Sequence, residues 1–234
     1  MRTALIAAAT ASLLASPALS ATRNFGVESF EKIRVEGPFR VKLATGVAPF
    51  ARATGSTAAI ERVAIEMRGN TLLVHSNPGG WGGYPGQDPG TVDVIVGTHD
   101  LTSAWISGSG GLAIDHVKGL SFDLSVQGSG AASVGQANVD QLNVAVVGTG
   151  SATLAGQAGK MTAIIRGISS LDASSLAAKD ATIGAEGAAT VAANVGGSVK
   201  LDASGPATIR LSGGPACELR VTGSTSVSGC RSTQ

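Results

Sequence analysis

The chain has 234 residues, a formal net charge of +1 and 33 glycines, and only 3% of its residues are aromatic. A nearly neutral chain offers no basic surface for nucleic acid, so we expect no nucleic-acid partner. So few bulky side chains cannot fill the thick core of a compact globule, whereas a narrow solenoid requires small ones.

The segment 1–21 matches the pattern of a secretory signal peptide. A positive start at Arg2 is followed by an apolar run at residues 4–14 and by small residues up to position 21. An apolar run of that length is too short to span a bilayer, although it would also suit a buried helix. We predict cleavage after Ser20 or Ala21, and export to the periplasm or the cell surface. The rest of the sequence contains no transmembrane segment.

Residues 22–100 contain short runs in which apolar and polar residues alternate, as they do in half-buried strands. Val41 and Leu43, for example, alternate with Arg40 and Lys42. These runs do not follow the spacing of the repeat that comes after them. We therefore predict irregular β coils that cap the N-terminal end of the fold.

Within this region, residues 77–90 are rich in Gly and Pro and contain Trp81 and the single tyrosine, Tyr84. Aromatic side chains on a loop suit stacking on a sugar ring or a partner, so Trp81 and Tyr84 are candidate ligand contacts. The alternative interpretation is an insertion loop without a ligand.

Residues 101–230 repeat one five-residue phrase: a small residue, two small or apolar residues, usually a hydroxyl residue, and an aliphatic residue. The copies are residues 110–114, 130–134, 150–154, 169–173, 187–191, 205–209 and 223–227. Successive copies begin about 18–20 positions apart, and a period this short and this regular is typical of a solenoid with one turn per repeat.

Alternate positions before each phrase are aliphatic or small. The residues four before the phrase are Ile106, Val126, Val146, Ile165, Ile183, Leu201 and Leu219. The residues between are chemically mixed, from Trp105 to Arg220, so we expect them on the solvent side. The glycine that opens the phrase is expected to form a corner with positive φ, and the small residue two before it is expected to face the core.

These patterns predict an all-β fold: a right-handed single-stranded parallel β-helix with about seven regular coils of 18–20 residues after the irregular N-terminal coils. The coils would stack about 4.8 Å apart. Residues 22–234 are expected to form one continuous domain.

The two cysteines, Cys217 and Cys230, both lie in the last coil. An exported protein meets an oxidising compartment, so we predict a disulfide between them rather than free thiols.

The residues reveal no catalytic, cofactor or metal site. Gly108-Ser109-Gly110 and its copies lack the third glycine and the helix of a phosphate-binding loop, so structural corners explain them better. The three histidines have no partner at metal-ligand spacing. Charged residues of both signs, which could serve a polysaccharide-processing site, are scattered over the outward positions. They are Arg166, Lys200, Asp202, Glu218 and Arg220.

Two segments and the corners carry a resemblance to a known family. Residues 30–46 read FEKIRVEGPFRVKLATG, residues 69–74 read GNTLLV, and Gly-Ser-Gly or Gly-Thr-Gly corners begin at Gly108, Gly128 and Gly148. Over residues 25–230 the chain resembles the bacterial head GIN domain family, DUF2807. The resemblance implies a right-handed parallel β-helix, export and an adhesin-like role, and it brings no catalytic residues. The later corners, which contain Ser169, Ala185 and Pro206, depart from the family's motif.

We therefore expect an exported, non-enzymatic β-helix that acts in adhesion or in envelope interaction, with a glycan or a surface component as its partner. The alternative is a carbohydrate-binding or polysaccharide-processing β-helix. A third possibility is an ice-binding row of outward hydroxyls, which are Ser133, Thr153, Thr190, Thr208 and Ser226. The sequence leaves the oligomeric state open.

Overall fold

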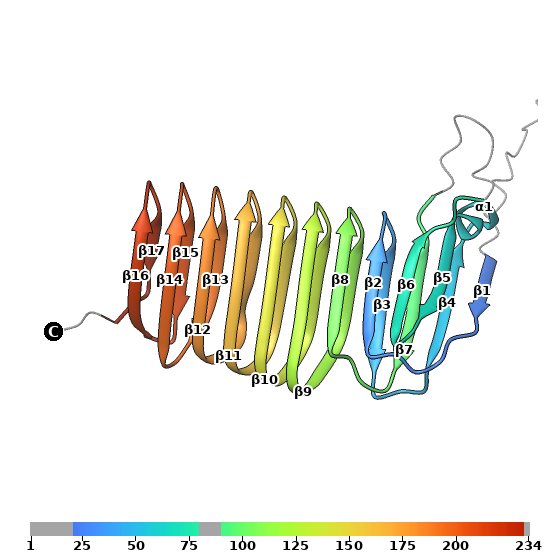
Figure 1. Cartoon of the computed structure of the whole chain (residues 1–234), viewed down its shortest axis with the longest axis horizontal. Helices are drawn as coiled ribbons and strands as arrows, with labels where there is room; N and C mark the ends of the chain where they lie inside the picture. The colour runs from blue at the N-terminus through green and yellow to red at the C-terminus, as the bar shows by residue number, and fades with distance from the viewer. Residues whose placement is uncertain (1–20, 80–89, 232–234) are drawn as a thin grey trace, which may run out of the picture.

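The chain folds into an elongated stack of strands, seen in a computed structural model that describes residues 21–79 and 90–231 (Figure 1). The predicted signal peptide up to residue 20, and both Trp81 and Tyr84, lie outside the described residues. No helix within the described ranges is long and apolar enough to span a membrane.

The stack has an N-terminal part and a regular part. The N-terminal elements are β1 (Ala21–Phe25), β2 (Lys32–Glu36), β3 (Arg40–Thr45), β4 (Phe50–Gly55), α1 (Thr57–Glu61), β5 (Val63–Arg68), β6 (Thr71–Ser76) and β7 (Asp93–Thr98). The regular part consists of β8 (Ser103–Gly108), β9 (Gly111–Gly128), β10 (Ala131–Gly148), β11 (Ser151–Gly167), β12 (Ser170–Glu186), β13 (Thr190–Val195), β14 (Ser198–Ser204), β15 (Thr208–Ser212), β16 (Ala216–Thr222) and β17 (Ser226–Ser228).

The regular part is the predicted parallel β-solenoid. It has seven strand–corner–strand units, which make about six turns. Each unit pairs in parallel with the next, so that Ile106 lies beside Val126 and Val126 beside Val146. These side chains point inward and are fully buried, whereas the residues between them face solvent. The predicted alternation of inside and outside is confirmed.

The predicted spacing is wrong after the fourth unit. Ile165 pairs with Ala185 rather than with Ile183, which instead pairs with Ala163. The fourth step is therefore longer than predicted by two positions, and the last three units are displaced by the same amount from the predicted alignment. Because side chains alternate with a period of two, this displacement leaves every inward residue inward.

The corner glycines have roles opposite to those predicted. The residues with positive φ are the first glycines of the corners, such as Gly108 (φ 107°) and Gly128 (φ 103°), and they do not face the core. The second glycines are buried: a Cβ on Gly130 would lie 2.7 Å from the carbonyl oxygen of Gly110. The first glycine bends the chain, and the second lets one coil approach the next.

Two N-terminal strands continue the solenoid, although the sequence predicted irregular coils there. Ile33 and Val35 of β2 pair with Ala104 and Ile106 of β8, and β3 pairs in the same way with the start of β9. On its other side β2 pairs with β6, so the strand drawn in blue lies between two later segments in Figure 1. The spatial order of coils thus departs from their order in the sequence.

The N-terminal end is closed by antiparallel strands. β5 pairs with β6, β4 pairs with β7, and β1 pairs with β4, all antiparallel. The short helix α1, whose N-cap Ser56 accepts a hydrogen bond from the backbone of Ala59, joins β4 to β5 at this end. The predicted cap is therefore present, and it consists of strands that reverse direction.

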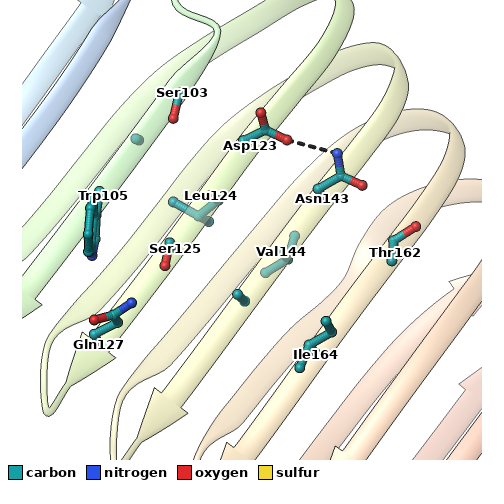
Figure 2. A pocket seen from close by; sticks show the side chains of 12 residues that line it. Ser103, Trp105, Asp123, Leu124, Ser125, Gln127, Asn143, Val144, Thr162 and Ile164 are labelled. Carbon is teal, nitrogen blue, oxygen red and sulfur yellow. Dashed lines mark hydrogen bonds between the residues drawn. The ribbon is translucent and has the colours of Figure 1, made fainter. Parts of the chain in front are cut away.

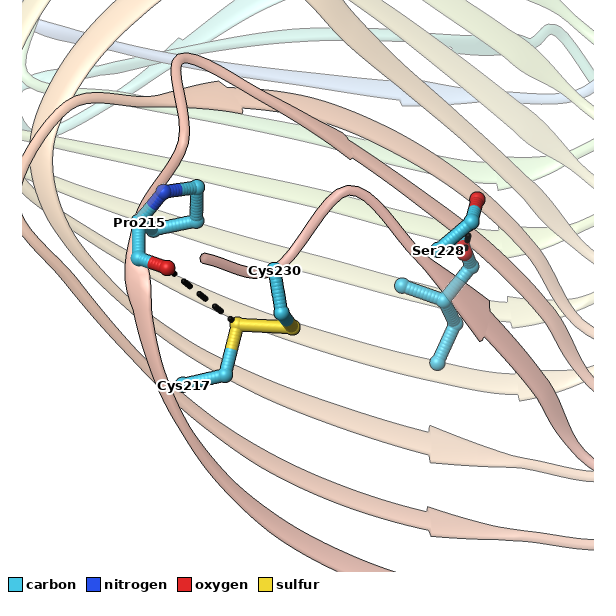
Figure 3. Close-up of a disulfide and its surroundings, with 5 residues drawn as sticks. Pro215, Cys217, Ser228 and Cys230 are labelled. Atoms are coloured by element: carbon cyan, nitrogen blue, oxygen red, sulfur yellow. Dashed lines mark hydrogen bonds between the residues drawn. A yellow bond between two sulfur atoms is a disulfide. The ribbon is translucent and has the colours of Figure 1, made fainter. Parts of the chain in front are cut away.

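At the C-terminal end the last coil contains the predicted disulfide between Cys217 and Cys230 (Figure 3). The two Cα atoms are 5.7 Å apart. Just after Cys230, the backbone of Arg231 donates a hydrogen bond to the carbonyl of Pro215, immediately before β16. The bridge thus ties the end of the chain back to the start of the last coil. A disulfide in this place fits an extracytoplasmic protein.

Candidate ligand-binding face

One outer surface of the solenoid, which we call the groove face, is formed by the outward side chains of the strands that lead into the corners. These strands are β2, β8, the last parts of β9 to β12, β14 and β16. Their side chains stand in rows that run along the stack, because the parallel register places equivalent residues side by side.

A groove of about 440 Å³ lies on this face where large side chains flank small ones (Figure 2). In one row Trp105 is followed by Ser125, Ala145 and then Ile164. The small residues form the floor, while Trp105 and the exposed Ile164 form the walls. The walls are three strand spacings apart, about 14 Å. The groove is therefore long enough for an extended ligand.

The Trp105 indole packs against Arg34 of the neighbouring strand β2. The guanidinium of Arg34 stacks 4.1 Å from the ring centroid, and Arg34 also forms an ion pair with Glu36 at 2.5 Å. Figure 2 shows the indole edge-on, so the ring stands up from the sheet beside Ser125. The indole Nε1 atom is buried and has no hydrogen-bond partner among the described residues. One ring face is thus covered by Arg34, and the other borders the groove.

Polar groups line the long sides of the groove. Asn143 Nδ2 donates a hydrogen bond to Asp123 Oδ1 at 2.8 Å, which orients both side chains beside the floor (Figure 2). Ser103 and Thr162 continue this side, and Gln127 lies on the opposite side. A carboxylate, two amides and two hydroxyls therefore surround a floor of small side chains and an aromatic wall, and they supply donors and acceptors for a polar ligand.

A second hollow of about 380 Å³ begins on the other side of Ile164. It brings together four of the five charged residues predicted to face outward, which are Lys200, Asp202, Glu218 and Arg220. Lys200 Nζ forms an ion pair with Glu218 at 3.4 Å. Arg166 lies outside this hollow and pairs with Glu186 at 3.1 Å. Most of the charges expected to be scattered are thus clustered at one end of the groove face.

The opposite outer surface, which we call the hydroxyl face, belongs to the strands that leave the corners. Its regular row pairs residue by residue along the last five coils. The row consists of Ser151, Ser170, Thr190, Thr208 and Ser226. Ser133 and Thr153, which were predicted to share a row with Thr190, instead stand in the next row beside Asp172. Neither the groove nor the charged hollow includes a residue of this row.

Two aspartates have a lowered pKa, and both lie away from the groove. The hydroxyl and the backbone N–H of Ser198 donate to Asp180 Oδ1 at 2.6 and 2.9 Å, which lowers the pKa of that carboxyl. Ser174 lowers the pKa of Asp172 in the same way. Because Asp180 and Ser198 belong to successive coils, their bonds join one coil to the next.

The part of the chain that the structure describes contains no group of three His, Cys, Asp or Glu side chains that could hold a metal ion. His75 lies 3.5 Å from Glu66, and His116 lies 3.2 Å from Asp115. Neither pair belongs to the residues that line the groove.

The sequence contained a signal for the groove that we did not interpret. The row from Trp105 to Ile164 was predicted to face outward, but its large–small–small–large order was not recognised as a hollow. Trp81 and Tyr84, which were singled out instead, lie on the segment between β6 and β7 and outside the described residues.

Comparison with known proteins supports this fold. A family described as "Putative auto-transporter adhesin, head GIN domain" matches residues 29–215. No curated protein matches the chain.

Among solved structures, a "putative adhesin" from Bacteroides fragilis is 17% identical with a TM-score of 0.77, and the match covers 89% of this chain and 95% of that one. A "putative lipid binding protein" from Parabacteroides distasonis is 16% identical with a TM-score of 0.67, at the same coverage. A "putative adhesin" from Parabacteroides merdae is 17% identical with a TM-score of 0.61, again at that coverage. At these identities the likeness shows a shared fold.

Proposed function

The chain belongs to the head GIN domain family, and on this premise we propose that it is a non-catalytic, exported module that mediates adhesion by binding a glycan in the groove beside Trp105. The groove is the observation that carries the proposal. Two solved structures of the same fold are each described as a "putative adhesin", which is consistent with a role in surface recognition.

The chemistry of the groove suits a sugar chain. A pyranose ring has an apolar face that stacks on an indole, and its rim of hydroxyls needs donors and acceptors at the sides. Trp105 offers the ring face, while the Asp123–Asn143 pair and Gln127 offer the polar contacts. A groove that spans three strand spacings between its walls favours a short run of sugar units over a single small molecule.

Two observations of different kinds support export. The N-terminal sequence has the pattern of a signal peptide, and the last coil is closed by a disulfide, which persists in an oxidising compartment. The mature protein would act in the periplasm or at the cell surface. Measuring the N-terminal residue of the exported protein tests this: cleavage after Ser20 or Ala21 is expected, and an intact Met1 would contradict it.

Binding to a glycan array tests the ligand class. Replacing Trp105 by Ala is expected to weaken binding about tenfold or more, because the aromatic wall is lost. The matched control is Leu120→Ala, since Leu120 is 79% exposed and lies outside the groove. Unchanged binding by the Trp105 variant would contradict a site in the groove. Loss of binding only on replacing Trp81 and Tyr84 would move the contact to that loop.

The alternative function is polysaccharide processing at the charged hollow. Two carboxylates and two cations meet there, which is the combination that acid–base cleavage of a polysaccharide requires. Incubation with acidic polysaccharides separates the two functions. We expect no products; products that disappear in a Glu218→Gln variant would establish the alternative.

A further inference from the structure

The two ends of the solenoid differ in whether the last coil is covered by further strands. The N-terminal end carries the antiparallel strands β5, β4 and β1. At the C-terminal end, β16 pairs with β14 and with no other strand of the described residues. Beneath it the core is open, because the inward-facing Leu219 and Val221 are 45% and 40% exposed.

We propose that two copies of the chain associate end to end through antiparallel pairing of β16 with β16. A long exposed edge strand offers a row of unpaired backbone groups and readily pairs with another strand. A second copy brings the same open core end, so the exposed Leu219 and Val221 of each copy would be covered by those of the other. Pairing of identical edges about a twofold axis produces a closed dimer.

The backbone of β16 determines which residues are free to pair. Ala216 donates its N–H to the carbonyl of Gly197, and the carbonyl of Thr222 accepts from the N–H of Gly205. The backbone polar groups of these two even-numbered residues therefore point toward the preceding coil. Backbone direction alternates along a strand, so Cys217, Leu219 and Val221 direct their N–H and C=O groups to the open edge. Among the described residues after β17, Arg231 donates a backbone hydrogen bond to Pro215, and Cys230 is joined to the side chain of Cys217.

The side-chain charges then select one register. If the twofold axis passes through Leu219, the free backbone groups of Leu219 meet those of its copy, and Cys217 meets Val221. The same register puts Glu218 directly opposite Arg220 of the other copy, twice by symmetry. An axis through Arg220 or through Glu218 would place like charges face to face, which destabilises a strand pair. Hydrogen-bond direction and charge thus favour the same arrangement.

The dimer would extend the groove face. Residues directly opposite in an antiparallel pair lie on the same side of the sheet, so the groove faces of the two copies would join across the axis. The charged hollows that contain Lys200 and Asp202 would meet at the centre, with a Trp105 groove on each side. Two linked grooves would strengthen attachment to a repeating ligand.

Analytical ultracentrifugation of the chain between about 1 and 100 µM tests the dimer, since an interface of one strand and a core end is small and association is expected to be weak. Replacing Arg220 by Glu, or Glu218 by Arg, places like charges opposite each other. Either change is expected to raise the dissociation constant about tenfold or more. The double variant Glu218→Arg with Arg220→Glu restores the opposite charges and is expected to restore the dimer.

The control is Arg23→Glu, which reverses a charge on β1 at the other end of the stack and is expected to leave association unchanged. Melting curves for every variant show whether the fold is intact, because Lys200 and Asp202 lie beside the exchanged charges within one chain. A chain that stays monomeric throughout, or a dimer that the single changes do not weaken, would overturn the proposal. Failure of the double variant to restore a dimer weakened by both single changes would overturn the register.

Discussion

The groove face and the hydroxyl face are built from the same coils, yet the groove and the charged hollow both lie on the groove face. On the hydroxyl face, Ser151, Ser170 and Thr190 follow one another with little change in size. On the groove face, side chains in one row change from Trp105 to Ala145 and back to Ile164. The sequence repeat therefore determines which residues form the core of the solenoid, whereas changes in side-chain size along one outer row produce the groove.

The relation between the two faces depends on the corners, and a corner substitution should have the largest effect. Gly148 has φ 112°, and a Cβ there would lie 2.6 Å from the carbonyl oxygen of Gly128. Gly148→Ala is therefore expected to lower the free energy of unfolding by about 2–4 kcal/mol, measured by chemical denaturation.

Gly111→Ala is the control for that change. Gly111 has no positive φ, the nearest atom to its Cβ would be 3.9 Å away, and the next coil already has Ala131 at this position. Little change in stability is expected. Equal losses in the two variants would mean that corner geometry is not what holds the faces together.

In the final coil, β16 belongs to the groove face and β17 belongs to the hydroxyl face. Replacing Cys217 and Cys230 together by Ala removes a bridge across 13 residues and is expected to cost about 2–3 kcal/mol. The loss should be local, with faster amide exchange in β16 and β17 and unchanged exchange in β9 and β10. Uniformly faster exchange along the stack would contradict a local role.

The smallest effect is expected at the Asp180–Ser198 contact, which joins two coils at the edge of the groove face. Donation from Ser198 lowers the pKa of Asp180 below 3.8 in the folded chain. The contact therefore stabilises the fold above that pH, and the stabilisation is lost as the pH falls through the lowered pKa. Asp180→Asn should melt slightly below the native chain at neutral pH, and the difference should vanish in strong acid, below the lowered pKa. If the difference in melting temperature persists in strong acid, the Asp180–Ser198 contact is not its cause.

Inside and outside could be predicted from the sequence, but neighbours along the outside could not. The misplaced alignment after Ser169 moved residues by two positions, so Ile183 remained a core residue while its neighbour on the preceding coil, Ala163, was misassigned. The shift left Asp202 and Arg220 in one row, as predicted, but it misplaced Arg166, which was predicted in that row and instead pairs with Glu186. The place of β2 in the solenoid was missed for a different reason. Its pairing with β8 joins residues far apart in the chain, such as Ile33 and Ala104, and no local sequence pattern indicates such a contact.

Binding of a glycan in the groove beside Trp105 can be reported by the indole itself. The chain has two tryptophans, so a Trp81→Phe variant leaves Trp105 as the single source of tryptophan emission. Titration of this variant with the glycans that an array identifies should shift or quench its fluorescence, with the same midpoint as binding measured by calorimetry. Binding by calorimetry with an unchanged emission spectrum would place the ligand elsewhere and contradict the claim.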